Sequence, residues 1–311
     1  MNWDERIRVP VEPVSVLAEI DLLFESQIEE WSQLSRGVEG LKRTRSRKFV
    51  VNGFPVVARH IPHRIESTTA SIDPDAIRNR ACFLCAENLP DPEKGLAFDQ
   101  KFVIVCNPFP ILKNHLSIVL REHTPQRIEG HFLTMLELSA QLPGYVILYN
   151  GPECGASAPD HMHFQACLFD DIPLIKDLDS ASGGVIPGYP RSTFVLKDSN
   201  KVRLGQRFSE LFAALEVHNQ DRVEPMINLV AFRRDGECIV VVFPRSMHRP
   251  QVFHTGELTW TPGAIDLCGV VVLPVESDLD KITAADIQEV FGEVSLKAQT
   301  VKTIADTLRQ V

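Results

Sequence analysis

The sequence contains no apolar run long enough to form a membrane helix. Such a helix needs about 20 consecutive apolar residues, and no stretch of this 311-residue chain approaches that length. The first residues, Met1 to Arg6, also lack the basic-then-apolar order of a secretory signal. We therefore expect a cytoplasmic protein without a membrane partner.

The chain also lacks an excess of basic residues. It has 32 Lys and Arg against 41 Asp and Glu, a net charge of −9. Because binding to nucleic acid requires basic surface, we expect no nucleic-acid partner. One basic run, residues 42–48, is either a solvated loop before a strand or a patch for a polyanion. The seven cysteines, an odd number, favour reduced thiols, and 44% hydrophobic composition allows one large domain or two fused units.

Hydrophobic periodicity predicts a mixture of helices and strands. Helices are expected over residues 14–36, 124–141, 201–217 and 283–309, the last opened by a capping box of Thr283 and Asp286, and another begins at Asp73-Pro74. A hairpin is expected over residues 48–58, turning at Asn52-Gly53. Further strands are expected at 102–105, 116–120, 145–149, 163–169, 227–232, 238–243 and 265–273.

The most informative segment runs from Gly155 to Gln165. His161, His163 and Gln165 alternate with other residues at the period of a strand, so their side chains are expected on one face. The Gly/Ser/Pro stretch before them predicts a loop whose backbone N–H groups can face an anion. Since a neutral imidazole can attack phosphorus and leave again, the segment suits phosphorus chemistry. A structural core histidine is the alternative for His163.

Cys82 and Cys85 form a second motif. A Cys-x-x-Cys pair is either redox-active or metal-binding. A thioredoxin-like redox motif opens a helix, whereas a loop follows this pair. A closed structural zinc site needs four ligands, and the candidates for the other two are His115, His123 and His161. Two ordinary buried cysteines are the alternative.

Two segments of the chain resemble each other. An apolar strand followed by arginine, histidine, proline and glutamine occurs at residues 116–126 and again at residues 238–251. The similarity is either chance or the trace of a duplicated unit in which only the first copy kept the His-x-His pair. Residues 170–190, with Gly183-Gly184 and several prolines, are expected to connect the two halves.

Residues 80–170 resemble the histidine triad superfamily, in the branch of the galactose-1-phosphate uridylyltransferases, the GDP-L-galactose phosphorylases and the diadenosine tetraphosphate phosphorylases. The resemblance is carried by Cys82-x-x-Cys85, Asn107-Pro108-Phe109-Pro110, Leu120-Arg121-Glu122-His123, Tyr149-Asn150-Gly151, Gly155-Ala156-Ser157 and His161-Met162-His163-Phe164-Gln165-Ala166. It implies an α+β fold of histidine-triad-like antiparallel sheets with helices, in two fused, pseudo-duplicated halves. The expected regions are 1–75, a helix and hairpin packing on the core; 76–175, the catalytic half; and 176–311, a degenerate second half.

The resemblance also implies a role for each matching residue. It makes His163 the nucleophile and Gln165 a hydrogen-bond donor to the transferred phosphoryl group. The implied substrate-binding residues are Ser157 and Gly155 of the phosphate loop, Asn150 beside it, and Asn107 and Phe109 toward the nucleoside. The implied zinc ligands are Cys82, Cys85, His123 and His161, with His123 preferred over His115 because it directly follows a strand, as in the family. Arg64 is expected either at a phosphate or on the surface, and the same choice holds for Arg245, His248 and Arg249.

Three positions bear on the reaction type. Asp160 is an extra residue between the loop serine and the first histidine, and Met162 stands where the uridylyltransferases have proline. Gln165 stands where the short hydrolases of the superfamily have a third histidine, which favours transfer over release to water. The implied function is transfer of a nucleoside monophosphate from an NDP-sugar or dinucleoside polyphosphate to phosphate or a sugar phosphate, through a nucleotidyl-histidine. A histidine-triad hydrolase and a non-catalytic nucleotide-binding protein are the alternatives; the base, the sugar and association into a homodimer stay open.

Overall fold

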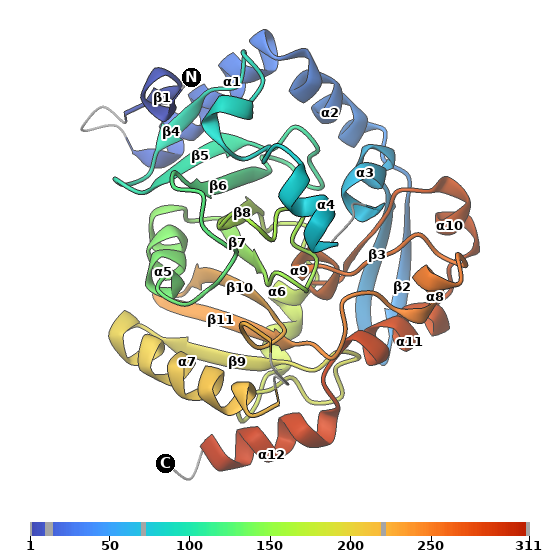
Figure 1. The fold of residues 1–311 in the computed structure, drawn as a ribbon. Helices are drawn as coiled ribbons and strands as arrows, with labels where there is room; N and C mark the ends of the chain where they lie inside the picture. The colour runs from blue at the N-terminus through green and yellow to red at the C-terminus, as the bar shows by residue number, and fades with distance from the viewer. Residues whose placement is uncertain (1, 10–14, 70–72, 219–221, 309–311) are drawn as a thin grey trace.

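The computed structural model describes residues 2–9, 15–69, 73–218 and 222–308, and one large sheet crosses most of the molecule (Figure 1). Within the described residues this sheet has nine strands in the order β1 (Ile7–Arg8), β4 (Gly95–Ala97), β5 (Phe102–Cys106), β6 (Leu116–Leu120), β8 (His163–Leu168), β7 (Tyr145–Asn150), β10 (Ile227–Arg234), β11 (Glu237–Pro244) and β9 (Phe194–Asp198). A smaller sheet has the order β12 (Val270–Leu273), β3 (Phe54–His60) and β2 (Ser46–Val51). No helix in these ranges is long and apolar enough to cross a membrane.

Helices cover both faces of the large sheet. The α-helices are α1 (Val16–Glu30), α2 (Ser32–Lys42), α3 (Ile65–Thr69), α4 (Pro74–Asn79), α5 (Phe132–Gln141), α6 (Leu174–Asp177), α7 (Lys201–Glu216), α8 (Gln251–His254), α9 (Ala264–Leu267), α10 (Glu276–Lys281), α11 (Ala284–Val294) and α12 (Ala298–Leu308). Short 3-10 turns are η1 (Trp3–Glu5), η2 (Pro62–Arg64), η3 (Ala86–Asn88) and η4 (Leu178–Ser180).

Each face of the large sheet has its own apolar core. On one face, α1, α5, α7 and α12 enclose a cluster that includes Phe102, Ile118 and Phe164. On the other face, side chains such as Leu148 and Val241 pack toward the small sheet, α9 and α11. Because both faces are covered, the central strands are apolar at nearly every position rather than at alternate ones. The expected α+β class is confirmed, with mixed sheets, since β1–β4 and β12–β3 pair in parallel and the other pairs are antiparallel.

The duplication is visible in the order of elements. The unit β6–α5–β7–β8 recurs as β9–α7–β10–β11, and the sheet order β6-β8-β7-β10-β11-β9 reads symmetrically about the β7–β10 pair. This pair is antiparallel, with Asn150 opposite Asn228. The two halves are therefore fused edge to edge in one sheet. The alignment inferred from the sequence is wrong in register, because it matched β11 to β6, whereas β11 occupies the place of β8.

The N-terminal hairpin joins the second half of the chain. β3 pairs in parallel with β12, with Val57 opposite Val270. The turn at Asn52-Gly53 is as expected, with both residues at positive φ. In the basic run, residues 43–45 form a largely exposed turn before β2, as the solvated-loop alternative predicts. Arg45 pairs there with acidic residues of α10, and Arg47 donates to carbonyls of residues 279, 280 and 282. The boundaries expected at residues 75 and 175 stay predictions.

Two predicted helices are each divided in two. The helix expected over 14–36 breaks at Trp31, which is buried and extended (φ −118°, ψ 98°), and its first residue, Val14, lies outside the described residues. The helix expected over 283–309 begins with the predicted capping box but breaks at Ser295. There the backbone bonds instead to the end of β11, with Leu296 N–H donating to the carbonyl of Pro244.

Other boundaries are wrong for tertiary reasons. The helix expected from residue 124 begins only at Phe132, because residues 124–130 lie against the site and are held there by long-range hydrogen bonds of Gln126. The strand expected over 265–273 is α9 followed by β12, divided at Gly269, whose φ of +94° ends the helix. The edge strand β9 was not predicted. The remaining expected strands and the helix at 201–217 are present.

Candidate active site

His163 is the first residue of β8 and is held on three sides. Its Nδ1 lies 2.8 Å from the carbonyl oxygen of His161, to which it donates. Its backbone N–H donates to Gln126 Oε1 (2.8 Å), and its carbonyl accepts from Gln126 Nε2 (3.0 Å). Burial lowers the pKa of His163 to about 4, so the ring is a neutral imidazole with Nε2 as its free nitrogen. This is the hydrogen-bonding pattern expected of a nucleophilic histidine.

Gln165 lies two residues further on the same face and is oriented by His115. His115 Nδ1 accepts from the N–H of Ile111, so its Nε2 carries the proton and donates to Gln165 Oε1 (3.1 Å). Burial, with the charge of Arg64, lowers the pKa of His115 to about 3. Because the amide oxygen is taken, Gln165 presents its NH2 group as a donor. His115 therefore lies at Gln165 and not in the cysteine cluster.

The loop between β7 and β8 is fixed by contacts with the second half. Gly155 has φ +93°, and a Cβ there would lie 3.1 Å from Gly263 Cα, so only glycine fits without a shift. Asn150 Oδ1 accepts from Ala264 N–H and from Asn228 Nδ2, both at 2.8 Å. Asn228 Nδ2 also donates to the carbonyl of Cys154. The loop is thus a rigid element shared by both halves.

Cys82, Cys85, His123 and His161 form a cluster whose ligand atoms all lie within 4.8 Å of one another. Cys82 Sγ lies 3.2 Å from His161 Nδ1, and Cys85 Sγ lies 3.1 Å from His123 Nδ1. For zinc bonds of about 2.3 Å to sulfur and about 2.1 Å to nitrogen, tetrahedral geometry places ligand atoms about 3.5 Å apart. His161 Nε2 donates to the carbonyl of Leu120 (2.7 Å), which leaves Nδ1 for a metal. The donor set and spacing fit a metal such as zinc.

The extra residue Asp160 lies beside this cluster. Its carboxylate pairs with Arg80 and reaches to 3.8 Å from His123 Nε2. A carboxylate in this position favours the tautomer whose Nδ1 faces the cysteines. Asp160 therefore belongs to the immediate surroundings of the cluster.

A cavity of about 410 Å³ lies in front of His163. It brings together predicted residues that are far apart in the sequence: Arg64, Asn107, Phe109, Ser157, His163 and Gln165. A smaller cavity of about 40 Å³ shares Arg64, Ser157 and Gln165 and adds Asn150, Gly155 and residues 261–266 of the second half. All eight predicted catalytic and substrate-binding residues therefore line one of two adjoining cavities.

Arg64 supplies a positive charge at the junction of the two cavities. It follows the hairpin in η2 and lines both cavities. Burial lowers the pKa of Arg64 to about 10, opposed by the charge of Asp266, so the guanidinium stays charged near neutral pH. The sequence left Arg64 either at a phosphate or on the surface. In the structure it lines both cavities together with Ser157 and Gln165.

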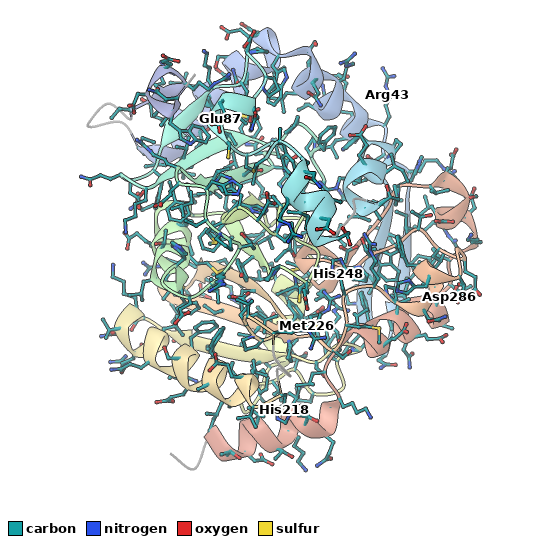
Figure 2. The ribbon with its side chains drawn as sticks, in the orientation of Figure 1. Arg43, Glu87, His218, Met226, His248 and Asp286 are labelled. Carbon is teal, nitrogen blue, oxygen red and sulfur yellow. The ribbon has the colours of Figure 1, made fainter. Side chains whose placement is uncertain are left out.

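The arginines and histidine of the second half lie elsewhere. Arg245 is buried, and its guanidinium donates to Asn228 Oδ1 (2.6 Å) and to the carbonyls of residues 247, 248, 262 and 294. Arg249 lies over the ring of Phe253, 4.6 Å from its centroid. Figure 2 shows His248 and Met226 below α4, and both line a separate cavity of about 330 Å³. Arg245 is thus a structural residue and neither a phosphate ligand nor a surface group.

Sequence reasoning missed Gln126, the orienting role of His115, and Asn228. Gln126 is 1% exposed, and its amide bonds the backbone of His163 together with the carbonyl of Asn150. Each of these residues acts through a partner at least 24 positions away in the sequence. Local spacing carries no signal for such contacts. The nearest to a signal is a polar residue among apolar ones, as Asn228 is within residues 227–232 of β10.

Comparison with known proteins supports this architecture. Residues 23–168 match a family described as "Domain of unknown function (DUF4922)", and residues 183–311 match the family "GDPGP1-like, C-terminal domain". No curated protein sequence matches the chain. The crystal structure of yeast Ap4A phosphorylase Apa2 superposes with a TM-score of 0.60 at 15% identity, covering 86% of this chain and 97% of the yeast chain. The same enzyme in complex with Ap4A gives a TM-score of 0.57 at 17% identity, covering 86% and 97%.

At these identities the structural likeness establishes the fold, while the family match covers the second half of the chain. The His-x-His strand, the Cys/His cluster and the duplicated sheet lie within that fold. Residues 183–311 thus match the GDPGP1-like C-terminal domain, and the chain has the fold of yeast Ap4A phosphorylase.

Proposed function

We propose that this protein is a nucleotidyl-transferring phosphorylase that works through a nucleotidyl-histidine. Nε2 of His163 attacks the α-phosphorus of an NDP-sugar or dinucleoside polyphosphate. The bond between this phosphorus and the bridging oxygen breaks, and a sugar phosphate or nucleoside polyphosphate leaves with the electron pair. An oxygen of a phosphate acceptor then attacks the same phosphorus, which releases His163 and gives the nucleotide product.

Donors around the phosphorus would stabilise the charge that builds on its non-bridging oxygens. The NH2 group of Gln165, the hydroxyl of Ser157 and the guanidinium of Arg64 line the space beside His163. Their value depends on rigid placement, since preorganised donors need no reorganisation during the reaction. His115 fixes Gln165, and Asn150 with Asn228 fixes the loop that bears Ser157.

Zinc held by Cys82, Cys85, His123 and His161 would have a structural task. When bound, it would fix the segment that carries His161. The carbonyl of the same residue accepts from His163 Nδ1. His163 itself keeps the proton on Nδ1 and so presents Nε2 to the cavity, whatever holds His161.

The observation that carries the proposal is the position of His163. Its ring lies at the wall of a cavity of about 410 Å³, one nitrogen is bonded to the chain, and the other is left for substrate. The replacement of a third histidine by Gln165 supports transfer to an acceptor over release to water.

The direct test is a panel of NDP-sugars and dinucleoside polyphosphates, each incubated with and without inorganic phosphate. A phosphorylase gives a nucleoside diphosphate and a sugar phosphate from an NDP-sugar only when phosphate is present. Equal release of nucleoside monophosphate in both tubes would instead identify a hydrolase. Binding without turnover of any substrate would leave a nucleotide-binding protein.

A further inference from the structure

The pairing of β7 with β8 stops short of His163. The ladder between the two strands ends at Leu148 opposite Gln165, although each strand continues for two more residues toward that end of the sheet. There Asn150 of β7 pairs with β10, and His163 of β8 pairs with β6. The two strands, which lie side by side in Figure 1, therefore fork at the end that carries His163.

The side chain of Gln126 fills the gap in this ladder. Asn150 would stand opposite His163 if the antiparallel pairing continued. Instead, Gln126 Nε2 donates to the carbonyls of Asn150 (2.9 Å) and His163 (3.0 Å), and Gln126 Oε1 accepts from the N–H of His163 (2.8 Å). A reversed amide would set its hydrogens against the N–H of His163 and its oxygen against two carbonyls, so the orientation of the amide is determined. One side-chain amide thus replaces the direct bonds between the strands.

Gln126 is also bonded to the far end of the β7–β8 loop. Its own N–H donates to the carbonyl of Pro159 (3.1 Å), while its side chain reaches Asn150 at the start of the loop. Two residues further on, the N–H of Ile128 donates to Glu224 Oε2 (3.0 Å) of the second half. Gln126 therefore holds both ends of the loop, from a segment that is itself anchored.

We propose that Gln126 is a positioning residue of the reaction, which keeps β7 and β8 forked at His163. The fork determines the space between the His163 ring and Ser157 of the β7–β8 loop, and both of these residues line the main cavity. Without the amide, Asn150 and His163 can bond directly, which draws the histidine away from its place in the cavity wall. A displacement of about 1 Å is enough to slow a reaction by about 10²-fold. The inference rests on the proposed function, because it takes His163 as the nucleophile.

A role in stability alone is the competing explanation, since Gln126 satisfies backbone groups that are buried. The chain offers a matched control for this explanation. Gln27 of α1 is 0% exposed, and its amide likewise donates to a carbonyl, that of Pro92 (2.9 Å), and accepts from a backbone N–H, that of Lys94 (2.8 Å). The described residues that line the two cavities do not include Gln27. Loss of Gln27 should therefore lower stability without changing the rate of the reaction.

The first measurement is the rate at which each protein forms the nucleotidyl group in a single turnover, with the best substrate labelled at the α-phosphate. Gln126→Leu should form this group about a hundredfold more slowly than the wild type, with KM within a few-fold in steady-state assays. Gln27→Leu should keep the wild-type rate within a few-fold, at a melting temperature lowered by a similar amount. A Gln126→Leu protein with the wild-type rate, or equal losses of rate in both variants, would overturn the inference.

Gln126→Glu distinguishes the bonds of the amide from the shape of the side chain. As a carboxylate the new side chain sets lone pairs against two carbonyls, whereas the neutral acid donates to one of them and accepts from His163. Because burial raises the pKa of a carboxyl group, the rate of this variant relative to wild type should rise between about pH 8 and about pH 6. The ratio for Gln126→Leu should stay constant. A Gln126→Glu ratio that does not change with pH would contradict the role of these bonds, and it decides the question also where Gln126→Leu does not fold.

A crystal structure of Gln126→Leu tests the fork without any turnover. The inference predicts that the β7–β8 ladder lengthens, with the N–H of His163 bonded to the carbonyl of Asn150. Asn150 and His163 in their wild-type positions would overturn it. This measurement separates the inference from the proposed function. A wild-type protein that never forms a nucleotidyl-histidine would remove that function, and the position of His163 in the variant would still decide whether Gln126 holds the fork.

Discussion

The two copies of the duplicated unit differ in what their last strands carry. β8 begins with His163 and has Gln165 two residues on, both at the cavity. β11 occupies the matching place in the second copy, and its residues from Cys238 to Phe243 are apolar and buried on both faces. The residues of the proposed reaction therefore belong to one copy, while the matching strand of the other copy is part of the core.

The second copy contributes polar groups at the edges of the first. Asn228 bonds to Asn150 and to the carbonyl of Cys154 in the β7–β8 loop, and Glu224 accepts from the hydroxyl of Tyr149 (2.5 Å) and from the N–H of Ile128 (3.0 Å). The comparison shows that a half without the His-x-His pair still holds the loops that surround this pair in the other half.

The largest expected effect distinguishes a histidine of the first copy from one of the second. His163→Asn should reduce turnover by about 10⁴-fold or more, because it removes the nucleophile. His248→Asn, at a histidine of the second half that lines a separate cavity, should leave turnover within a few-fold. Steady-state kinetics with the best substrate measures both, with thermal unfolding to check that each variant is folded. Equal losses of turnover in the two variants would contradict the assignment of the reaction to the first copy.

The cysteines of the two halves should also differ, in whether they bind a metal. The purified protein should carry about one zinc per chain, and Cys82→Ser should lose it, with a lower melting temperature and turnover reduced about tenfold to a hundredfold. Cys238→Ser, a buried cysteine of β11, should keep the metal. Elemental analysis and thermal unfolding measure this. A metal-free wild-type protein of unchanged stability would remove the zinc assignment.

A smaller effect is expected at His115, which acts through Gln165. His115→Leu leaves the amide of Gln165 without its donor, and we expect a tenfold to hundredfold loss in kcat with little change in KM. His115→Gln keeps a donor and should retain more activity. In combination with Gln165→Leu the His115→Leu effect should largely vanish, since both act at one point. Additive losses would show that His115 has a separate role.

The last prediction concerns stability and not turnover, at Glu224, which joins the halves. Burial raises its pKa in the folded protein to about 7, above the ordinary value of 4.5. Folding therefore favours the protonated form: this contribution to stability is complete below pH 4.5 and is lost as pH rises through about 7. Glu224→Gln stays neutral, so its stability relative to wild type should rise by up to about 3 kcal/mol between these limits. Denaturant unfolding at several pH values measures this, and a pH-independent difference would contradict it.

Much of the site could be predicted because its key residues are close together in the sequence. Cys82 with Cys85, and the segment from Gly155 to Gln165, carry their geometry in local spacing. The choice of His123 over His115 also agrees with the cluster found. The strands were recognisable from short apolar runs bounded by turn residues.

The rest depended on contacts between distant segments. Residues 124–130 have a helical pattern, but the bonds of Gln126 to His163 hold them in a loop. Trp31 divides a predicted helix because its ring is buried at the cavity. The sequence similarity after β6 and β11 spans only a few residues and pairs the wrong strands, whereas the order of strands in the sheet matches β11 to β8.

The most direct measurement is isolation of the covalent intermediate. The protein is mixed with its best substrate, labelled at the α-phosphate, without an acceptor, then denatured and digested. The account predicts an acid-labile nucleotidyl group on His163, absent from His163→Asn and discharged to a nucleoside diphosphate when phosphate is added before denaturation. Turnover with no bound label, or label on another residue, would contradict it.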